Sequence, residues 1–113
     1  MAGLAVLLKL GGSPKLTDQG AVARAAGEVE DGFVPQRSSI SRGGKSALAR
    51  DVDGRIMVIK SHGNKFAGRF LVSDSTAREE VDGLVVDPGE PRFGTVRLSL
   101  TDASYWADAI NRL

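Results

Sequence analysis

Three pairs of turn-forming residues divide the later part of the chain into short segments, and they limit the possible folds more than any other feature. The pairs are Asp53-Gly54, Gly63-Asn64 and Asp82-Gly83. Each pair lies between segments rich in valine, isoleucine, leucine or phenylalanine, which is the pattern of a β-hairpin with a two-residue loop. Hairpins that follow one another along a chain form an antiparallel meander. We therefore expect residues 47–100 to build mostly antiparallel sheet.

The chain also carries signals for a first strand and for two helices around these hairpins. Leu4–Leu10 is an apolar run that ends at two glycines, and it predicts a strand. An alanine-rich helix should begin after Thr17, an N-cap residue, and continue up to Gly32. A second helix should begin at Thr101 or Asp102. Its apolar side chains fall four and three residues apart and should lie on the sheet: Trp106, Ile110 and Leu113.

These elements predict an α+β fold: a mostly antiparallel meander sheet of five or six strands, an N-terminal alanine-rich helix and a C-terminal helix. A chain of 113 residues has the length of one domain, so we expect a single domain over residues 1–113. Residues 35–46, PQRSSISRGGKS, are polar, basic and rich in serine and glycine. This composition predicts a flexible basic loop.

Charge is distributed unevenly along the chain, although the net charge is only +1. Residues 35–72 contain eight basic and two acidic residues, whereas residues 73–113 contain four basic and eight acidic residues. A basic segment beside an acidic one has two interpretations. It can mark a site for an acidic ligand, or the opposite charges can pair within the fold or between subunits.

The hairpin at Gly63 and Asn64 suggests where such a ligand would bind. With these two residues in the loop, Phe66 and Phe70 lie on one face of the hairpin and face the core. The basic side chains then lie on the other face, toward the tip, where they meet the donors of Asn64 and of the Gly63 backbone. Adding the cations of the loop gives the candidate anion-binding or partner-binding residues: Arg42, Lys45, Lys60, His62, Asn64, Lys65 and Arg69.

We interpret the chain as a small soluble, non-enzymatic binding or assembly module. Its basic loop and hairpin tip would contact an acidic protein, a polyanion or its own copy. Two modest helices do not cover both faces of a sheet of this size, and its edge strands need protection, so we expect a homodimer. Nucleic acid is not expected, because the aromatic side chains near the tip are assigned to the core and leave no platform for stacking bases.

Several kinds of chemistry lack the residues they need. The chain has no cysteine, and His62 is its single histidine, so we expect no zinc or other metal site, no cofactor and no catalytic cysteine or histidine. Absence of cysteine is compatible with the reducing cytoplasm, where we place the protein. No apolar run approaches the ~20 residues of a membrane helix, so we expect no membrane partner. The alternative function is a hydrolase-type enzyme that uses carboxylates in Asp74–Asp87.

Overall fold

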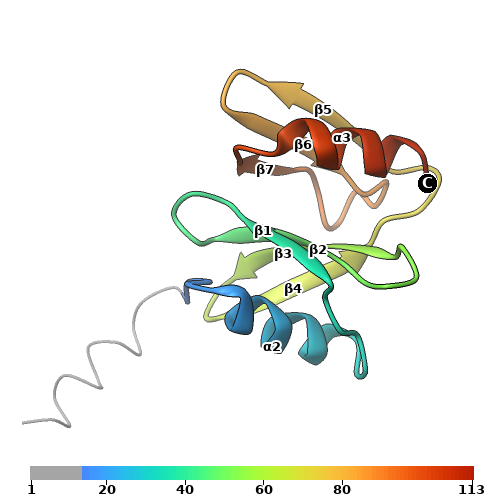
Figure 1. The fold of residues 1–113 in the computed structure, drawn as a ribbon. Helices are drawn as coiled ribbons and strands as arrows, with labels where there is room; N and C mark the ends of the chain where they lie inside the picture. Colours follow the sequence, from blue (N-terminus) through green and yellow to red (C-terminus); the bar gives the residue numbers. More distant parts are fainter. Residues whose placement is uncertain (1–13) are drawn as a thin grey trace, which may run out of the picture.

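The computed structural model describes residues 14–113, and within this range the chain forms two helices and seven strands (Figure 1). The first antiparallel sheet contains β1 (Arg37–Ile40), β2 (Ser46–Arg50), β3 (Ile56–His62) and β4 (Lys65–Phe70). The second contains β5 (Thr76–Glu80), β6 (Gly83–Asp87) and β7 (Val96–Ser99). The helices are α2 (Gln19–Val29) and α3 (Ala103–Asn111). The strand expected at Leu4–Leu10 lies outside the described residues.

The predicted α+β class, with antiparallel strands and a helix near each end, is confirmed. The strands of residues 14–113 divide into two sheets of four and three strands instead of one sheet of five or six. The physical reason lies in β3, whose consecutive residues Ile56–Ile59 are all fully buried. Because neighbouring residues of a strand face opposite sides, both faces of the first sheet are apolar and both need a cover.

Each face of the first sheet has its own cover (Figure 1). Helix α2 covers one face and forms the helix-side core with Leu16, Val22, Ala25, Ala26, Phe33, Ala47, Ala49, Met57 and Ile59. The second sheet covers the other face, and α3 packs into the same layer. Together they form the inter-sheet core of Leu48, Ile56, Val58, Leu71, Ala77, Leu84, Val86, Phe93, Val96, Leu98, Ala103, Trp106, Ala107 and Ile110.

The hairpin at Gly63 and Asn64 is confirmed. His62 pairs with Lys65, and the register continues to Met57 opposite Phe70. Gly63 has a φ of 62°, whereas Asn64 has a negative φ, as a tight turn with glycine at its first central position requires. Phe66 and Phe70 pack against the helix-side core as expected, although both are only half-buried.

The hairpin predicted at Asp82-Gly83 exists, but its loop residues are Val81 and Asp82. Gly83 is instead the first residue of β6 and pairs with Ser99 of β7. A Cβ atom at Gly83 would overlap the carbonyl oxygen of Leu98. Glycine is therefore needed here for the close approach of two strands, and not for the turn.

The N-cap of α2 differs from the prediction, whereas the N-cap position of α3 is one of the two predicted residues. Asp18, not Thr17, is the N-cap of α2, and its Oδ1 accepts a hydrogen bond of 2.8 Å from the Ala21 N–H. Asp102 stands at the N-cap position of α3, but its carboxylate makes no capping hydrogen bond. Other groups bind this carboxylate, as described below.

Two of the three side chains expected under α3 are buried: Trp106 and Ile110. The third, Leu113, lies beyond the helix and is 40% exposed. The segment 35–46, expected to be a loop throughout, contains β1, and only residues 41–45 connect β1 to β2. Among residues 14–113, no helix has the length and apolar character needed to cross a membrane.

Candidate functional site

The β1–β2 turn and the β3–β4 turn lie side by side at one end of the first sheet. Ser46 at the start of β2 pairs with Lys60 near the end of β3. One residue further, the Ser61 N–H donates a hydrogen bond of 2.8 Å to the Lys45 carbonyl oxygen. The register of β2 on β3 therefore brings the basic residues of the two turns together, although they are about twenty positions apart in the sequence.

Backbone hydrogen bonds hold the β1–β2 turn in place. The Ser41 N–H donates to the Ser46 carbonyl, and the Arg42 N–H donates to the Ser99 carbonyl at the end of β7. Gly44 has a φ of 75° and is buried against Leu16, whose N–H donates a hydrogen bond of 2.7 Å to the Gly44 carbonyl. The side chains of Arg42 and Lys45 are exposed on this anchored turn.

The contact between Leu16 and Gly44 also brings Lys15 to this end of the sheet. We define the basic end as Lys15, Arg42, Lys45, His62, Asn64 and Lys65, all of which are exposed. Five of these residues were predicted from the sequence. Lys15 was not, because only the folded chain places its segment beside the β1–β2 turn.

Two predicted site residues make contacts elsewhere. The Lys60 ammonium lies 4.3 Å from the centre of the Phe93 ring and donates to the Phe93 carbonyl oxygen. The Arg69 guanidinium lies 5.0 Å from the same ring centre and donates a hydrogen bond of 3.0 Å to Glu90. Both cations thus hold the β6–β7 connection against the first sheet, a structural role that uses their charge within the fold.

Most of the other cations among residues 14–113 are engaged by ion pairs or hydrogen bonds within the fold, unlike those of the basic end. Arg37 and Arg69 of the first sheet and Arg55 of its β2–β3 turn each form an ion pair with a carboxylate. Within residues 14–113, the four lysine and arginine side chains of the basic end have no carboxylate oxygen within 4.0 Å. Their positive charge is therefore available to a partner.

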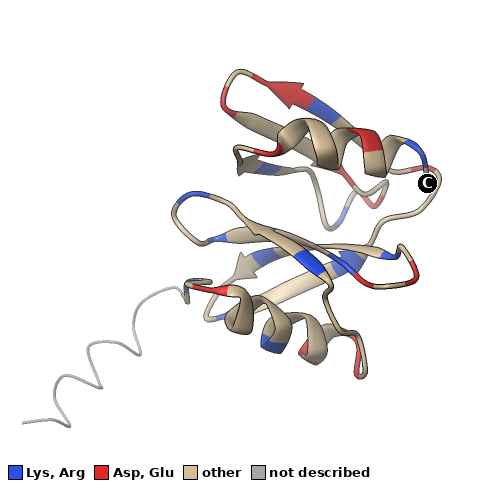
Figure 2. Cartoon of the chain, viewed as in Figure 1, with Lys and Arg blue, Asp and Glu red and all other residues tan. Residues whose placement is uncertain are grey.

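The acidic residues of Asp74–Asp87 lie on the other sheet and its turns (Figure 2). Glu79 accepts a hydrogen bond of 2.9 Å from the Ser104 hydroxyl, and Glu80 forms ion pairs with Arg78 and Arg97. Asp74 is exposed at the bend before β5. In the part of the chain that the structure describes, no three His, Asp or Glu side chains are placed to hold a metal ion.

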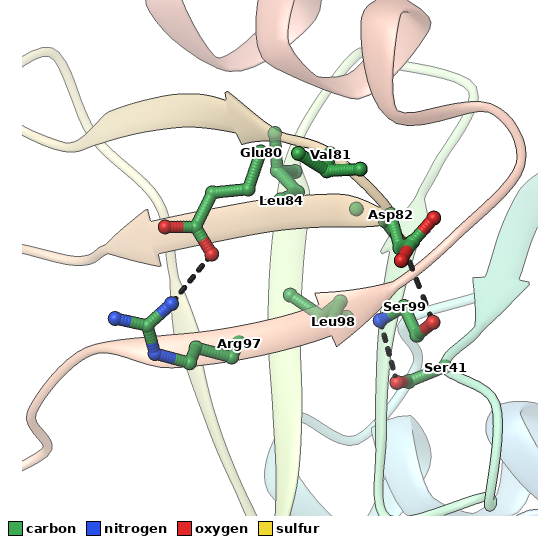
Figure 3. A pocket seen from close by; sticks show the side chains of 9 residues that line it. Ser41, Glu80, Val81, Asp82, Leu84, Arg97, Leu98 and Ser99 are labelled. Carbon is green, nitrogen blue, oxygen red and sulfur yellow. Dashed lines mark hydrogen bonds and ion pairs between the residues drawn. The ribbon is translucent and has the colours of Figure 1, made fainter.

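A hollow of about 530 Å³ lies between the β5–β6 turn, β7 and Ser41 (Figure 3). The ion pair of Glu80 with Arg97 spans one side of it. On the other side, the Ser99 N–H donates a hydrogen bond of 2.9 Å to the Ser41 hydroxyl. These polar groups bind one another, and their contacts join the second sheet to the β1–β2 turn.

A polar cluster around Asp102 was not foreseen beyond its expected role as a cap. The Asp102 carboxylate accepts hydrogen bonds from the Ser39 hydroxyl at 2.6 Å and from the Trp106 indole N–H at 3.2 Å, and it pairs with Arg37. Burial raises the pKa of Asp102, but these hydrogen bonds outweigh burial and lower the pKa overall. The cluster fastens α3 to β1, and only the folding of β1 beside Trp106 creates it.

Asp51 is the most buried carboxylate of the described residues that shows a shifted pKa. Burial raises its pKa, but hydrogen bonds from the side chain and backbone of Arg55 and from the Asp53 N–H lower it further than burial raises it. The carboxylate closes the β2–β3 turn, far from the basic end along the strands. Its role is to satisfy the backbone of that turn.

Comparisons of the chain with protein-family models, curated proteins and solved structures find no match. The assignment of a site therefore depends on the geometry of this chain. Among residues 14–113, the unpaired cations that gather at one exposed place are those of the basic end. The polar residues around Asp102 and around the hollow of Figure 3 are occupied with structural contacts.

Proposed function

We propose that this protein is a small cytoplasmic, non-enzymatic binding or assembly module that contacts an acidic partner through its basic end. The observation that carries this proposal is the meeting of Lys15, Arg42, Lys45 and Lys65 at one end of the first sheet with no carboxylate within 4.0 Å among residues 14–113. Exposed cations held close together attract negative charge more strongly than the same cations dispersed over a surface.

Charge-assisted hydrogen bonds would supply most of the contact energy. Lysine and arginine donate to carboxylate, sulfate or phosphate oxygens, and such bonds are stronger than those between neutral groups. The Asn64 side chain and the exposed backbone at Gly63 add neutral donors at the same place. This kind of recognition requires no nearby hydrophobic cleft, because it depends on charge and not on the shape of the partner.

Assembly with a second copy is the other form of this proposal. The acidic residues of the chain's last third lie on the second sheet, its turns and connections, and α3. The basic end of one copy and this acidic surface of another therefore have opposite charge (Figure 2). Exposed apolar side chains, which suit a subunit contact, also occur on the surface: Val34, Val52, Val72 and Val81. A dimer is the expected product if each copy uses both surfaces to contact the other copy.

A charge-removal experiment tests the proposal. The basic-end variant is Arg42→Gln/Lys45→Gln/Lys65→Gln. Its matched control, Arg78→Gln/Arg92→Gln/Arg112→Gln, removes three exposed cations from the side of the second sheet and α3, so both variants have the same net charge. Binding to heparin, a generic polyanion, is measured by titration at several salt concentrations, and self-association is measured by light scattering at the same concentrations.

We expect the wild-type protein to bind heparin or to self-associate, and to lose this binding as salt rises. The basic-end variant should bind at least tenfold more weakly and show a shallower dependence on salt, whereas the control variant should resemble the wild type. Equal losses in both variants would show that net charge alone matters. A wild-type protein that neither binds heparin nor self-associates at low salt would refute the proposal.

A further inference from the structure

The end of the first sheet opposite the basic end exposes apolar side chains. The β2–β3 turn, the β4–β5 connection and the C-terminus meet there (Figure 1), and together with Phe70 they line a hollow of about 410 Å³. The α2–β1 connection reaches the same end, because the Arg55 guanidinium lies 5.5 Å from the ring centre of Phe33 and 5.1 Å from that of Phe70. We define the apolar end by its exposed side chains: Val34, Val52, Val72 and Leu113.

Unpaired carboxylates lie among these apolar side chains. Four exposed acidic residues belong to the same turn and the same two connections: Glu30, Asp31, Asp53 and Asp74. Within residues 14–113, none of them has a lysine, arginine or histidine nitrogen within 4.0 Å. The two ends of the first sheet therefore carry unpaired charges of opposite sign (Figure 2).

The basic end also offers apolar surface. Phe66 is half-buried and lines a hollow of about 550 Å³ with Asn64 and Lys65, and a second hollow of about 250 Å³ that Lys15 also lines. One carboxylate, that of Glu28, lines both hollows. The aliphatic stems of the lysines can cover apolar groups while their ammonium groups stay at the rim. The basic end thus complements the apolar end in charge and provides an apolar centre for it.

We propose that the apolar end of one copy binds the basic end of a second copy, so that copies join head to tail. This inference rests on the proposed function and names the acidic partner, which is the protein itself. The contact would place the four unpaired cations of one copy opposite the four unpaired carboxylates of the next. Its centre would bury the exposed valines against Phe66 and the lysine stems, as apolar centres with polar rims do in protein interfaces.

Other pairings of surfaces between two copies fit less well. Residues 73–113 contain eight acidic residues, but four of them already form ion pairs within the fold: Glu80, Glu90, Asp102 and Asp108. That acidic surface therefore has less free charge to offer a basic end. Two apolar ends that face each other would bring their unpaired carboxylates together, and like charges across an interface repel. The apolar end and the basic end avoid both costs.

The positions of the two ends determine the kind of assembly. Strand β3 runs from one end to the other and has seven residues, which span about 20 Å. A copy that is bound at one end therefore still has its other end free for a further copy. Such a head-to-tail contact produces a ring or an open chain of copies. The product is larger than a dimer.

The test exchanges the charges of the two ends in the full chain. The basic-end reversal is Arg42→Glu/Lys45→Glu/Lys65→Glu, and the apolar-end reversal is Asp31→Lys/Asp53→Lys/Asp74→Lys. The swapped variant carries both sets of substitutions, so its net charge equals that of the wild type. Assembly is measured by light scattering over a range of protein and salt concentrations. Heparin binding and thermal unfolding are measured for every variant.

A second pair of variants tests the apolar contact without changing any charge. Val52→Asn removes an exposed valine from the β2–β3 turn at the apolar end. Its matched control, Val81→Asn, removes an exposed valine from the β5–β6 turn of the second sheet. Both substitutions place the same polar side chain in a hairpin turn, so a difference between them reports the position and not the chemistry.

The wild-type protein should form assemblies larger than a dimer, which grow with protein concentration and dissociate as salt rises. Each reversal alone should weaken association at least about a hundredfold, because like charges then face each other. The swapped variant should assemble as the wild type does, because opposite charges meet again. Val52→Asn should weaken association about fivefold, through the loss of buried apolar area, whereas Val81→Asn should have no effect.

Three outcomes would overturn the inference. If the wild-type protein binds heparin but stays monomeric or stops at a dimer at low salt, head-to-tail assembly is wrong and the proposed function stands. If the swapped variant unfolds at the same temperature as the wild type but does not assemble, the two ends do not meet. If a reversal lowers the unfolding temperature, the valine variants decide, and equal association of Val52→Asn and Val81→Asn excludes the apolar end.

Discussion

The two faces of strand β3 are covered by different structural elements. On one face, Ile56 and Val58 meet the second sheet and α3, including the fully buried Trp106. On the other, Met57 and Ile59 meet α2, whose fully or nearly fully buried residues are Val22, Ala25 and Ala26. The first cover is a sheet stiffened by its own strand ladders, with α3 bound to β1 through the hydrogen bonds of Asp102, whereas the second cover is a single helix with small side chains.

This difference indicates that the two cores have different roles. Large side chains between two sheets bury the most apolar area, so the inter-sheet core contributes most of the stability. The alanine-rich helix buries less area but allows close packing, and the segment before it carries Leu16 to the β1–β2 turn. We infer that the inter-sheet core stabilises the fold and that the helix-side layer positions the basic end.

The largest expected effect comes from the same substitution on the two faces of β3. Ile56→Ala should cost about 4 kcal/mol and Ile59→Ala about 2.5 kcal/mol, because a cavity costs less where the surroundings can collapse into it. Helix α2 can move toward the sheet as a single element, whereas each of the two sheets is stiffened by its own strand ladders and shifts less easily. Urea unfolding followed by circular dichroism measures both values. If both variants lose the same unfolding free energy, with the same slope of free energy against urea concentration, the two cores do not differ in their capacity to collapse into a cavity.

Glycine substitutions sharpen the comparison at a smaller scale. A Cβ atom at Gly83 would overlap the backbone of Leu98, while one at Gly68 would meet the side chains of Val29 and Met57 at 2.9 and 3.2 Å. Side chains and a single helix can shift, whereas the β7 backbone is fixed by its ladder to β6. Gly83→Ala should therefore cost about 3 kcal/mol and Gly68→Ala about 1 kcal/mol. A larger loss at Gly68, measured by thermal unfolding, would contradict this ranking.

Acid should produce the smallest effect. The pKa values of Asp51 and Asp102 are lowered in the folded state, so their contribution to stability is present above the unfolded value of about 4 and is lost as pH falls through the folded pKa. We expect unfolding free energy to decrease between about pH 4 and pH 2. The variant Asp51→Asn/Asp102→Asn should show a weaker decrease over this range. An equally steep decrease in wild type and variant would assign the acid sensitivity to other groups.

Local patterns in the sequence were sufficient where neighbouring residues decide the structure. The tight turn at Gly63 and Asn64 depends on the backbone freedom of one glycine and on alternation in the adjoining strands, and its predicted register is the observed one. Local patterns gave the wrong structure where contact with a segment distant in the sequence determines it. Gly83 was taken for a turn residue because the approach of β7 cannot be read from its neighbours.

The same distinction applies to the candidate site. The basic character of residues 35–72 is a property of the sequence, but the choice among its cations is not. Lys60 and Arg69 are occupied by Phe93 and Glu90, which come from a connection more than twenty residues later. Lys15 joins the basic end through the contact of Leu16 with Gly44. Charges that look alike in the sequence therefore differ in their availability after folding.

The sequence by itself determined the α+β class, the hairpin at residues 63 and 64, and the concentration of positive charge in the middle of the chain, because these depend on residue type and on neighbours. Only the tertiary structure decided that the strands form two sheets, that 37–40 is a strand, and which cations remain unpaired. Those outcomes depend on the burial of both faces of β3 and on contacts between residues far apart in the chain. Such contacts leave no local pattern in the sequence, because the two segments that form each contact are far apart along the chain.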